Sequence, residues 1–209
     1  MKQSLAWLAL SFVSALNTSG QSVTAPVDLY VDFQQSAPPA VVEALRTESE
    51  SILAPAGVQF RWWSLSDFRS ERVSATVVVV HFEEHCDLGG LVMRANEPGS
   101  LGWTEISDGT ILPFIHVDCA RVRTFLQTAL LGYPGKDQES IYGRALGRVL
   151  AHELYHVFAV TSKHAERGVA KEDYSVKDLL APDFHLQSKQ AGALRASRAL
   201  AGFTSGEVH

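Results

Sequence analysis

The sequence is poor in the residues that define several large classes of protein. It has two cysteines, two methionines and a formal net charge of −5 over 209 residues. A slightly acidic chain gives no electrostatic reason to bind nucleic acid, and two cysteines do not build the disulfide framework of a small secreted scaffold. A glycine-rich phosphate loop and a serine-nucleophile elbow are also missing from the sequence. These absences argue against a nucleic-acid-binding protein, a disulfide-rich scaffold, a phosphate-loop protein and a serine hydrolase with a nucleophile elbow.

The N-terminal stretch has the pattern of an export signal. Lys2 supplies a short positive region, and an apolar run extends from Leu5 to Leu16. This run is too short to cross a bilayer comfortably, and small residues follow it, with cleavage sites after Ala15 or near Gly20. The alternative is an N-terminal core helix or a membrane anchor. We expect residues 1–20 to be a signal peptide and residues 21–209 to form a secreted or periplasmic domain that is not membrane-bound.

The composition of the remaining chain is that of a globular protein with a substantial core. Hydrophobic residues make up 46% of the chain and charged residues 20%, which is neither a disordered nor a membrane-embedded composition. Cys86 and Cys119 are expected to pair if the protein is exported, because an exported protein meets an oxidising compartment. The alternative is two buried free thiols. The oligomeric state is not readable from the sequence.

The order of elements predicts a single α+β domain with a mixed, twisted sheet. Strand character is found in segments 28–33, 58–63 and 75–82, the last a β-branched run typical of a central strand covered on both faces. Segments 101–106 and 111–117 flank Asp108-Gly109 and predict an edge hairpin, in which Pro113 tolerates an edge position but not a central one. Helices are predicted over 38–55, 119–131, 141–161, 176–180 and 184–200, with Ser140 as the N-cap of the third.

The third of these helices contains the most informative stretch, VLAHELYHVF, at residues 149–158. His152 and His156 are four residues apart, so on a helix they lie one turn apart on the same face. Two imidazoles in this arrangement can bind one tetrahedral zinc ion, while Glu153 reaches a water molecule on the metal. The alternative is a chance distribution on a solvated face, but the surrounding residues are uncharged. Buried imidazoles need partners, and a metal supplies one for each.

At these residues the chain resembles the zincin metallopeptidases, and its element order resembles the metzincin branch. The resemblance implies a zincin-like domain with one catalytic Zn²⁺, a peptide or protein substrate, and Glu153 as the general base. It also implies that an extended peptide pairs with the edge strand of the hairpin. Metzincins continue their motif as HExxHxxGxxH. This chain has Ala159 at the glycine position and Ser162 at the third-ligand position, and its only methionines are Met1 and Met93.

The third metal ligand is therefore an open question in the sequence. His164 is the preferred candidate, although a straight helix would carry it about 12 Å beyond His156, so the chain must bend back after about Phe158. The alternative is an acidic ligand from a downstream segment, for which the candidates are Glu166, Glu172 and Asp173. Some metzincins place a downstream tyrosine near the zinc, and Tyr174 is the corresponding candidate here, with ordinary packing as the alternative.

Two functions follow from this pattern. The first is an exported, zinc-dependent metallopeptidase that hydrolyses peptide bonds. The second is a secreted, non-catalytic zinc-binding protein with a zincin-like fold.

Overall fold

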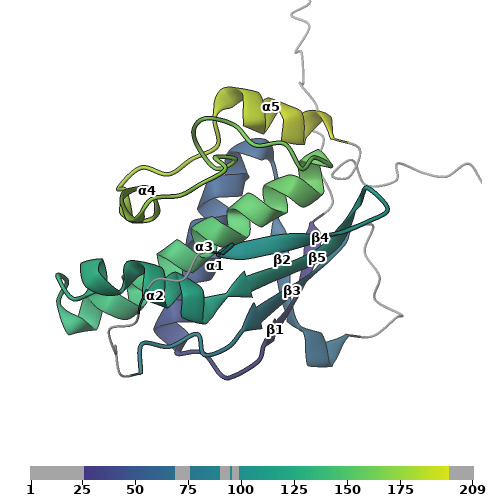
Figure 1. Cartoon of the computed structure of the whole chain (residues 1–209). Coiled ribbons are helices and arrows are strands. Elements are labelled where there is room, and N and C mark those ends of the chain that lie inside the picture. Colours follow the sequence, from purple (N-terminus) through teal and green to yellow (C-terminus); the bar gives the residue numbers. More distant parts are fainter. Residues whose placement is uncertain (1–25, 69–75, 90–94, 96–98, 198–209) are drawn as a thin grey trace, which may run out of the picture.

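The computed structural model describes residues 26–68, 76–89, 95 and 99–197. The predicted signal peptide lies outside these residues. The described part is a single α+β domain in which helices pack against a five-stranded mixed sheet (Figure 1). Among the described helices, none is long and apolar enough to cross a membrane. The predicted fold class, α+β with a mixed sheet in one domain, is confirmed at this level.

The sheet has the order β2-β1-β3-β5-β4. Its strands are β1 (Val27–Phe33), β2 (Phe60–Ser64), β3 (Val77–Glu83), β4 (Gly102–Ser107) and β5 (Thr110–Asp118). Neighbouring strands are parallel except for β4, which runs antiparallel to β5 in the predicted hairpin. Consequently β4 is an edge strand, with one side of its backbone unpaired within the sheet.

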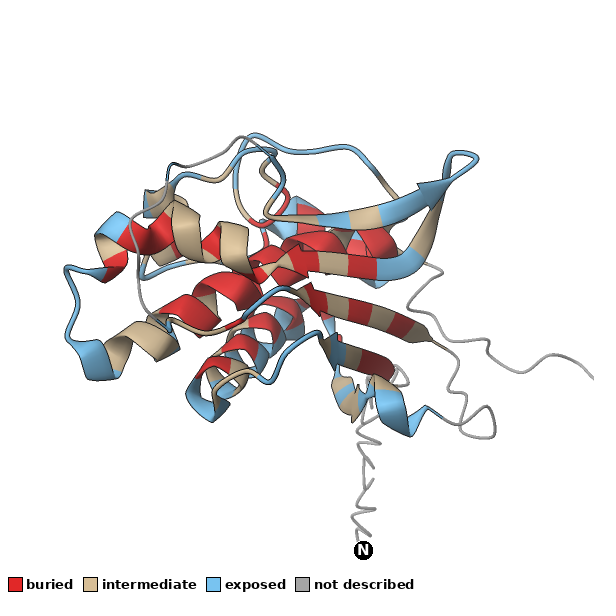
Figure 2. Ribbon diagram, turned by 60° about the horizontal axis from the view of Figure 1, so that its bottom comes forward, coloured by how far each residue is buried: buried red, intermediate tan, exposed pale blue. Residues whose placement is uncertain are grey.

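The central strand β3 is covered on one face and not on both. Its buried positions are Val78, Val80 and Phe82, while Val77 and Val79, between them, are only partly buried. Figure 2 shows this alternation along the strands. The prediction of coverage on both faces was therefore wrong, because a β-branched run also suits a strand with one half-exposed face.

Pro113 lies in β5, between β3 and β4, and so is not on an edge strand. The structure accommodates it because β5 pairs with β3 only from Phe114 onward. On its other side, the register with β4 shifts between Thr104 and Ile106. The missing N–H of Pro113 therefore falls in a stretch with no β3 partner, opposite an irregularity in β4.

The helices agree with the predicted positions, with two corrections to their ends. They are α1 (Pro39–Leu53), α2 (Cys119–Leu130), α3 (Gly135–Ala159), α4 (Val176–Leu180) and α5 (Ser188–Ala196), with short 3-10 turns η1 (Ala54–Ala56) and η2 (Leu65–Asp67). Helix α3 begins at Gly135, directly after Pro134, so Ser140 lies inside the helix and is not its N-cap. Helix α5 begins later than predicted and ends at Ala196, and residues 198–200 lie outside the described part of the chain.

Helix α3 is the centre of the core because α1 crosses it closely and the sheet covers another side (Figure 1). Gly143 and Gly147, one turn apart, allow this approach. A Cβ atom built on Gly147 would lie 2.6 Å from the carbonyl oxygen of Leu45 in α1. From Ala145 to Leu154 every residue of α3 is buried. A helix buried all round needs a specific reason for each polar side chain that it carries.

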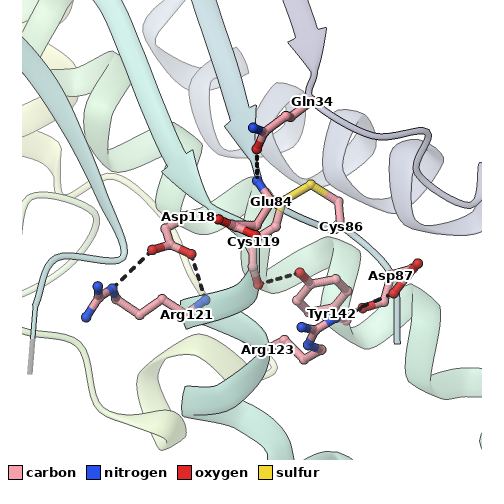
Figure 3. The surroundings of a disulfide bond; sticks show 9 residues. All are labelled: Gln34, Glu84, Cys86, Asp87, Asp118, Cys119, Arg121, Arg123 and Tyr142. Atoms are coloured by element: carbon pink, nitrogen blue, oxygen red, sulfur yellow. Dashed lines mark hydrogen bonds and ion pairs between the residues drawn. A yellow bond between two sulfur atoms is a disulfide. The ribbon is translucent and has the colours of Figure 1, made fainter. Parts of the chain in front are cut away.

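A disulfide joins Cys86, just after β3, to Cys119, the first residue of α2 (Figure 3). The Tyr142 hydroxyl of α3 donates a 2.7 Å hydrogen bond to the carbonyl oxygen of Cys119. Asp118 caps α2 by accepting a hydrogen bond from the backbone N–H of Arg121 at 2.8 Å. These contacts attach the start of α2 to both the sheet and α3. They therefore hold α2, α3 and the sheet in fixed relative positions.

We predict that Gly147→Ala destabilises the protein. Helix propensity alone would favour alanine by about 1 kcal/mol, but the added methyl group meets backbone in α1, and overpacking of this kind costs about 1–3 kcal/mol. Gly192→Ala in α5 is the matched control, because nothing lies within 4 Å of its added Cβ. Urea unfolding should give a lower free energy of unfolding for the first variant and a higher one for the second. Equal stabilisation by both would contradict the close packing of α1 on α3.

Candidate metal centre

Two histidines of α3 direct their ring nitrogens to the same point. His152 and His156 lie one helical turn apart, and both are 7% exposed. Their Nε2 atoms are 3.0 Å apart, and their ring centroids are 4.6 Å apart. The two rings therefore converge, as the spacing in the sequence predicts.

The outer nitrogen of each ring is held by a backbone carbonyl. Nδ1 of His152 lies 2.7 Å from the oxygen of Val169, and Nδ1 of His156 lies 2.6 Å from the oxygen of Thr161. A carbonyl only accepts, so each Nδ1 carries the hydrogen. Burial lowers the pKa of His152 to about 4 and also lowers the pKa of His156. Both rings are thus neutral at neutral pH, and two Nε2 lone pairs face each other, an arrangement that a cation between them would stabilise.

The chain bends back directly after α3 and brings a third histidine to this point. Val160 adopts the left-handed conformation, with a φ of 47° and a ψ of 52°. The N–H of Thr161 then donates to the carbonyl oxygen of His156 at 3.2 Å, as in a Schellman-type helix end. Beyond this turn, His164 lies with its ring centroid 4.8 Å from that of His156 and 5.3 Å from that of His152.

One ligand atom from each of the three histidines lies within 4.8 Å of the others. Tetrahedral coordination with Zn–N bonds of about 2.0–2.1 Å places neighbouring nitrogens about 3.3 Å apart, so small side-chain adjustments suffice. The three histidines could therefore hold a metal ion. Of the acidic alternatives, Glu172 and Asp173 line the same cleft but are not members of this group, and Glu166 lies beside a different pocket.

Glu153 lies next to the histidine group and is only 5% exposed. Its Oε2 accepts a 2.9 Å hydrogen bond from the Thr104 hydroxyl of β4. Burial raises the pKa of Glu153 to about 7, although the hydrogen bond from Thr104 acts in the opposite direction. A carboxyl group with a pKa near neutrality both accepts and releases a proton at neutral pH, as a general base and acid must.

Tyr174 lies behind His152. Its hydroxyl donates to the carbonyl oxygen of Val169 and is 3.2 Å from Nδ1 of His152, the nitrogen on the side away from His156. The same carbonyl thus receives both the tyrosine hydroxyl and the histidine N–H. In this position Tyr174 helps to orient the ring of His152.

Arg148, one turn before His152 in α3, attaches the C-terminal segment to the helix. Its side chain is 1% exposed and donates hydrogen bonds to Glu48 at 2.6 Å and to the carbonyl oxygens of Asp178 and Leu179 at 3.1 and 3.0 Å. The guanidinium group also lies over the ring of Phe184, 4.8 Å from its centroid. Arg148 of α3 therefore holds α4 in place, and α4 directly follows the segment that contains Val169 and Tyr174.

The three histidines and Glu153 line a cleft of about 680 Å³. Strand β4 forms one wall and the segment around Tyr174 another. Apolar side chains from three parts of the chain, Leu101, Phe125 and Val149, also line the cleft. The cleft therefore combines a group of polar residues with apolar lining, as small-molecule and peptide sites commonly do.

Another histidine, His116 in β5, lies in a separate cluster on the sheet. It is stacked between Trp103 and His81, with ring centroids 4.8 and 5.3 Å away. Its two ring nitrogens lie 2.8 Å from Glu83 and 3.0 Å from Glu105. These contacts link three strands of the sheet and are separate from the histidine group on α3.

Three residues that shape the centre, Thr104, Arg148 and Val160, were hardly recognisable from the sequence. Thr104 could have been placed on the same face of its strand as Gly102 and Ile106 by alternation, but nothing in the sequence pairs it with Glu153. Arg148 stood out only as a charge in an apolar helix. Val160 carries no signal for a left-handed turn, because β-branched residues rarely adopt one.

We predict that Val160→Gly stabilises the metal-free protein by about 1 kcal/mol, because glycine adopts the left-handed conformation without the strain that a β-branched residue carries there. Val42→Gly, inside α1, is the matched control and should lower stability by about 1 kcal/mol or more. The measurement is urea unfolding with a chelator present. A less stable Val160→Gly protein would show that the bend after α3 is not strained.

Comparison of the chain with protein-family models, with curated proteins and with solved structures gives no match.

Proposed function

We propose that the protein is an exported, zinc-dependent metallopeptidase, a divergent relative of the zincins. The observation that carries this proposal is the convergence of His152, His156 and His164 beside a buried glutamate, Glu153, in an open cleft. The order of a mixed sheet with an antiparallel edge strand followed by the histidine-bearing helix supports the resemblance to zincins.

Zinc is the proposed metal because of the donor set. Three neutral imidazoles suit zinc, and three protein ligands leave one coordination position open, which distinguishes catalytic from structural zinc sites. When bound, the ion would supply Lewis acidity, which polarises a peptide carbonyl and acidifies a water molecule. The carbonyl oxygens of Val169 and Thr161 hold the histidines with Nε2 unprotonated, the state that binds a metal.

Glu153 is the general base of the proposed reaction. Its carboxylate accepts a proton from the attacking water, whose oxygen bonds to the peptide carbonyl carbon, and then passes that proton to the amine nitrogen as the C–N bond breaks. In the metal-free protein burial raises the pKa of Glu153 to about 7, and this burial favours the carboxyl form that holds the proton between the two transfers. The fixed position of Glu153 in α3 means that no helix movement is needed to bring it to the site.

The edge strand β4 is the proposed binding element for the substrate backbone. It forms a wall of the cleft, and an extended peptide would add to it as a further strand. The apolar lining residues Leu101, Phe125 and Val149 would then contact an apolar side chain of a peptide or protein substrate. Export to the periplasm or the extracellular space is proposed from the N-terminal sequence, and the Cys86–Cys119 disulfide agrees with such a compartment.

We predict that the purified protein binds one zinc ion and that His164→Ala weakens the affinity by at least about 100-fold, since loss of residues that only support a ligand already costs about 10–100-fold. His185→Ala, at another exposed histidine, is the matched control and should bind zinc normally. Elemental analysis and chelator competition measure both. Absence of zinc from the folded, zinc-supplemented protein would rule out the proposed centre.

We predict that Glu153→Gln retains zinc but lowers kcat by about 10²–10⁴-fold, the usual contribution of a general base. Digestion of a peptide library, with and without a chelator, provides the measurement. Glu166→Gln, an exposed carboxylate outside the cleft, is the control and should cleave normally. If the zinc-loaded protein cleaves nothing, the non-catalytic zinc-binding alternative is correct. If Glu153→Gln cleaves normally, the base is a different residue.

A further inference from the structure

The edge strand β4 makes a direct side-chain contact with the buried glutamate of α3. The Thr104 hydroxyl lies 2.9 Å from Oε2 of Glu153 and 3.3 Å from the backbone carbonyl oxygen of the same residue. It is thus within reach of both the side chain and the main chain of Glu153. In the described part of the chain no other hydrogen-bond partner of the Glu153 carboxylate is found.

Strand β4 lies close enough to α3 for this contact because Gly102, two residues earlier on the same face, has no side chain. A Cβ atom at Gly102 would lie 2.9 Å from Val149 Cγ1, 2.9 Å from the backbone oxygen of His116 and 3.3 Å from Glu153 Cγ. Any larger residue would therefore push the strand away from the helix. Gly102 sets the distance, and Thr104 makes the bond.

The Glu153 side chain needs such a restraint. Its neighbours in the helix, His152 and Leu154, are held by a hydrogen bond and by core packing, but a glutamate has three rotatable bonds between its backbone and its carboxylate. With one oxygen accepting from Thr104, the rotation of the carboxylate is limited and the other oxygen is left for a reacting water.

We propose that Thr104 is a positioning residue that holds the Glu153 carboxylate in its reactive orientation, so that the strand to which the substrate pairs also places the base. This inference rests on the proposed peptidase function. It assigns Thr104 no contact with the reacting atoms. A substrate added to β4 would be held by the same strand that holds Glu153. Strand β4 would therefore fix the position of the scissile bond relative to the base.

The test compares three substitutions in the zinc-loaded, full-length protein. Thr104→Val keeps the volume and the β-branch but removes the hydroxyl, whereas Thr104→Ser keeps the hydroxyl and removes a methyl group. Thr124→Val, in α2, is the matched control, because the hydrogen bond that the described residues give the Thr124 hydroxyl stays within its own helix, to the Ala120 carbonyl at 2.9 Å. Each variant is assayed for zinc content, thermal unfolding, kcat and KM with one peptide substrate.

We expect Thr104→Val to lower kcat by about 10- to 100-fold, as misplacement of a reacting group does, while KM stays within about twofold and zinc content is unchanged. Thr104→Ser should recover kcat, and Thr124→Val should match the wild type. A wild-type kcat in Thr104→Val overturns the inference alone. A rise in KM with kcat unchanged, or an equal loss in Thr104→Ser, also overturns it by showing that the residue acts through strand packing. A zinc-loaded wild-type protein without activity overturns the proposed function as well.

Discussion

The whole site depends on the hydrogen bonds from two histidine rings to two backbone carbonyls. Val169 and Thr161 each accept from an Nδ1–H, and this leaves the Nε2 atoms of His152 and His156 facing each other at 3.0 Å. Burial keeps both rings neutral, because it lowers the pKa of each. Two neutral imidazoles held in this way repel each other through their lone pairs unless a cation lies between them. The fold therefore maintains an arrangement that a bound cation would stabilise.

Both carbonyls belong to the chain after α3, so the site depends on how that chain is folded back. The left-handed turn at Val160 reverses its direction at once, and this places Thr161 beside His156 and returns His164 to the group. Further along, Arg148 holds α4 against α3. On the opposite side of the cleft, β4 contacts Glu153 through Thr104. Segments that precede and follow α3 in the sequence thus meet at two turns of this helix.

Much of the fold was predictable from local patterns. The strands at 28–33 and 75–82, the hairpin around Asp108-Gly109 and the short helix at 176–180 are confirmed within a few residues, because alternation, turn residues and capping act over short distances. The start of α3 was misplaced by six residues, since a polar first turn after Pro134 resembles a loop. The prediction that β3 is covered on both faces was also wrong, because the type of side chain does not show how many layers pack against a strand.

The sequence by itself determined that His152 and His156 share one face of a helix, with Glu153 beside them, because helical periodicity is a local property of the chain. It also indicated that His164 would join them only if the chain bent sharply. Whether it bends, which carbonyls receive the imidazole N–H groups and which strand contacts Glu153 were decided only by the tertiary structure. Several of these contacts connect residues far apart in the sequence, such as Thr104 and Glu153, and no local pattern shows that such residues lie side by side.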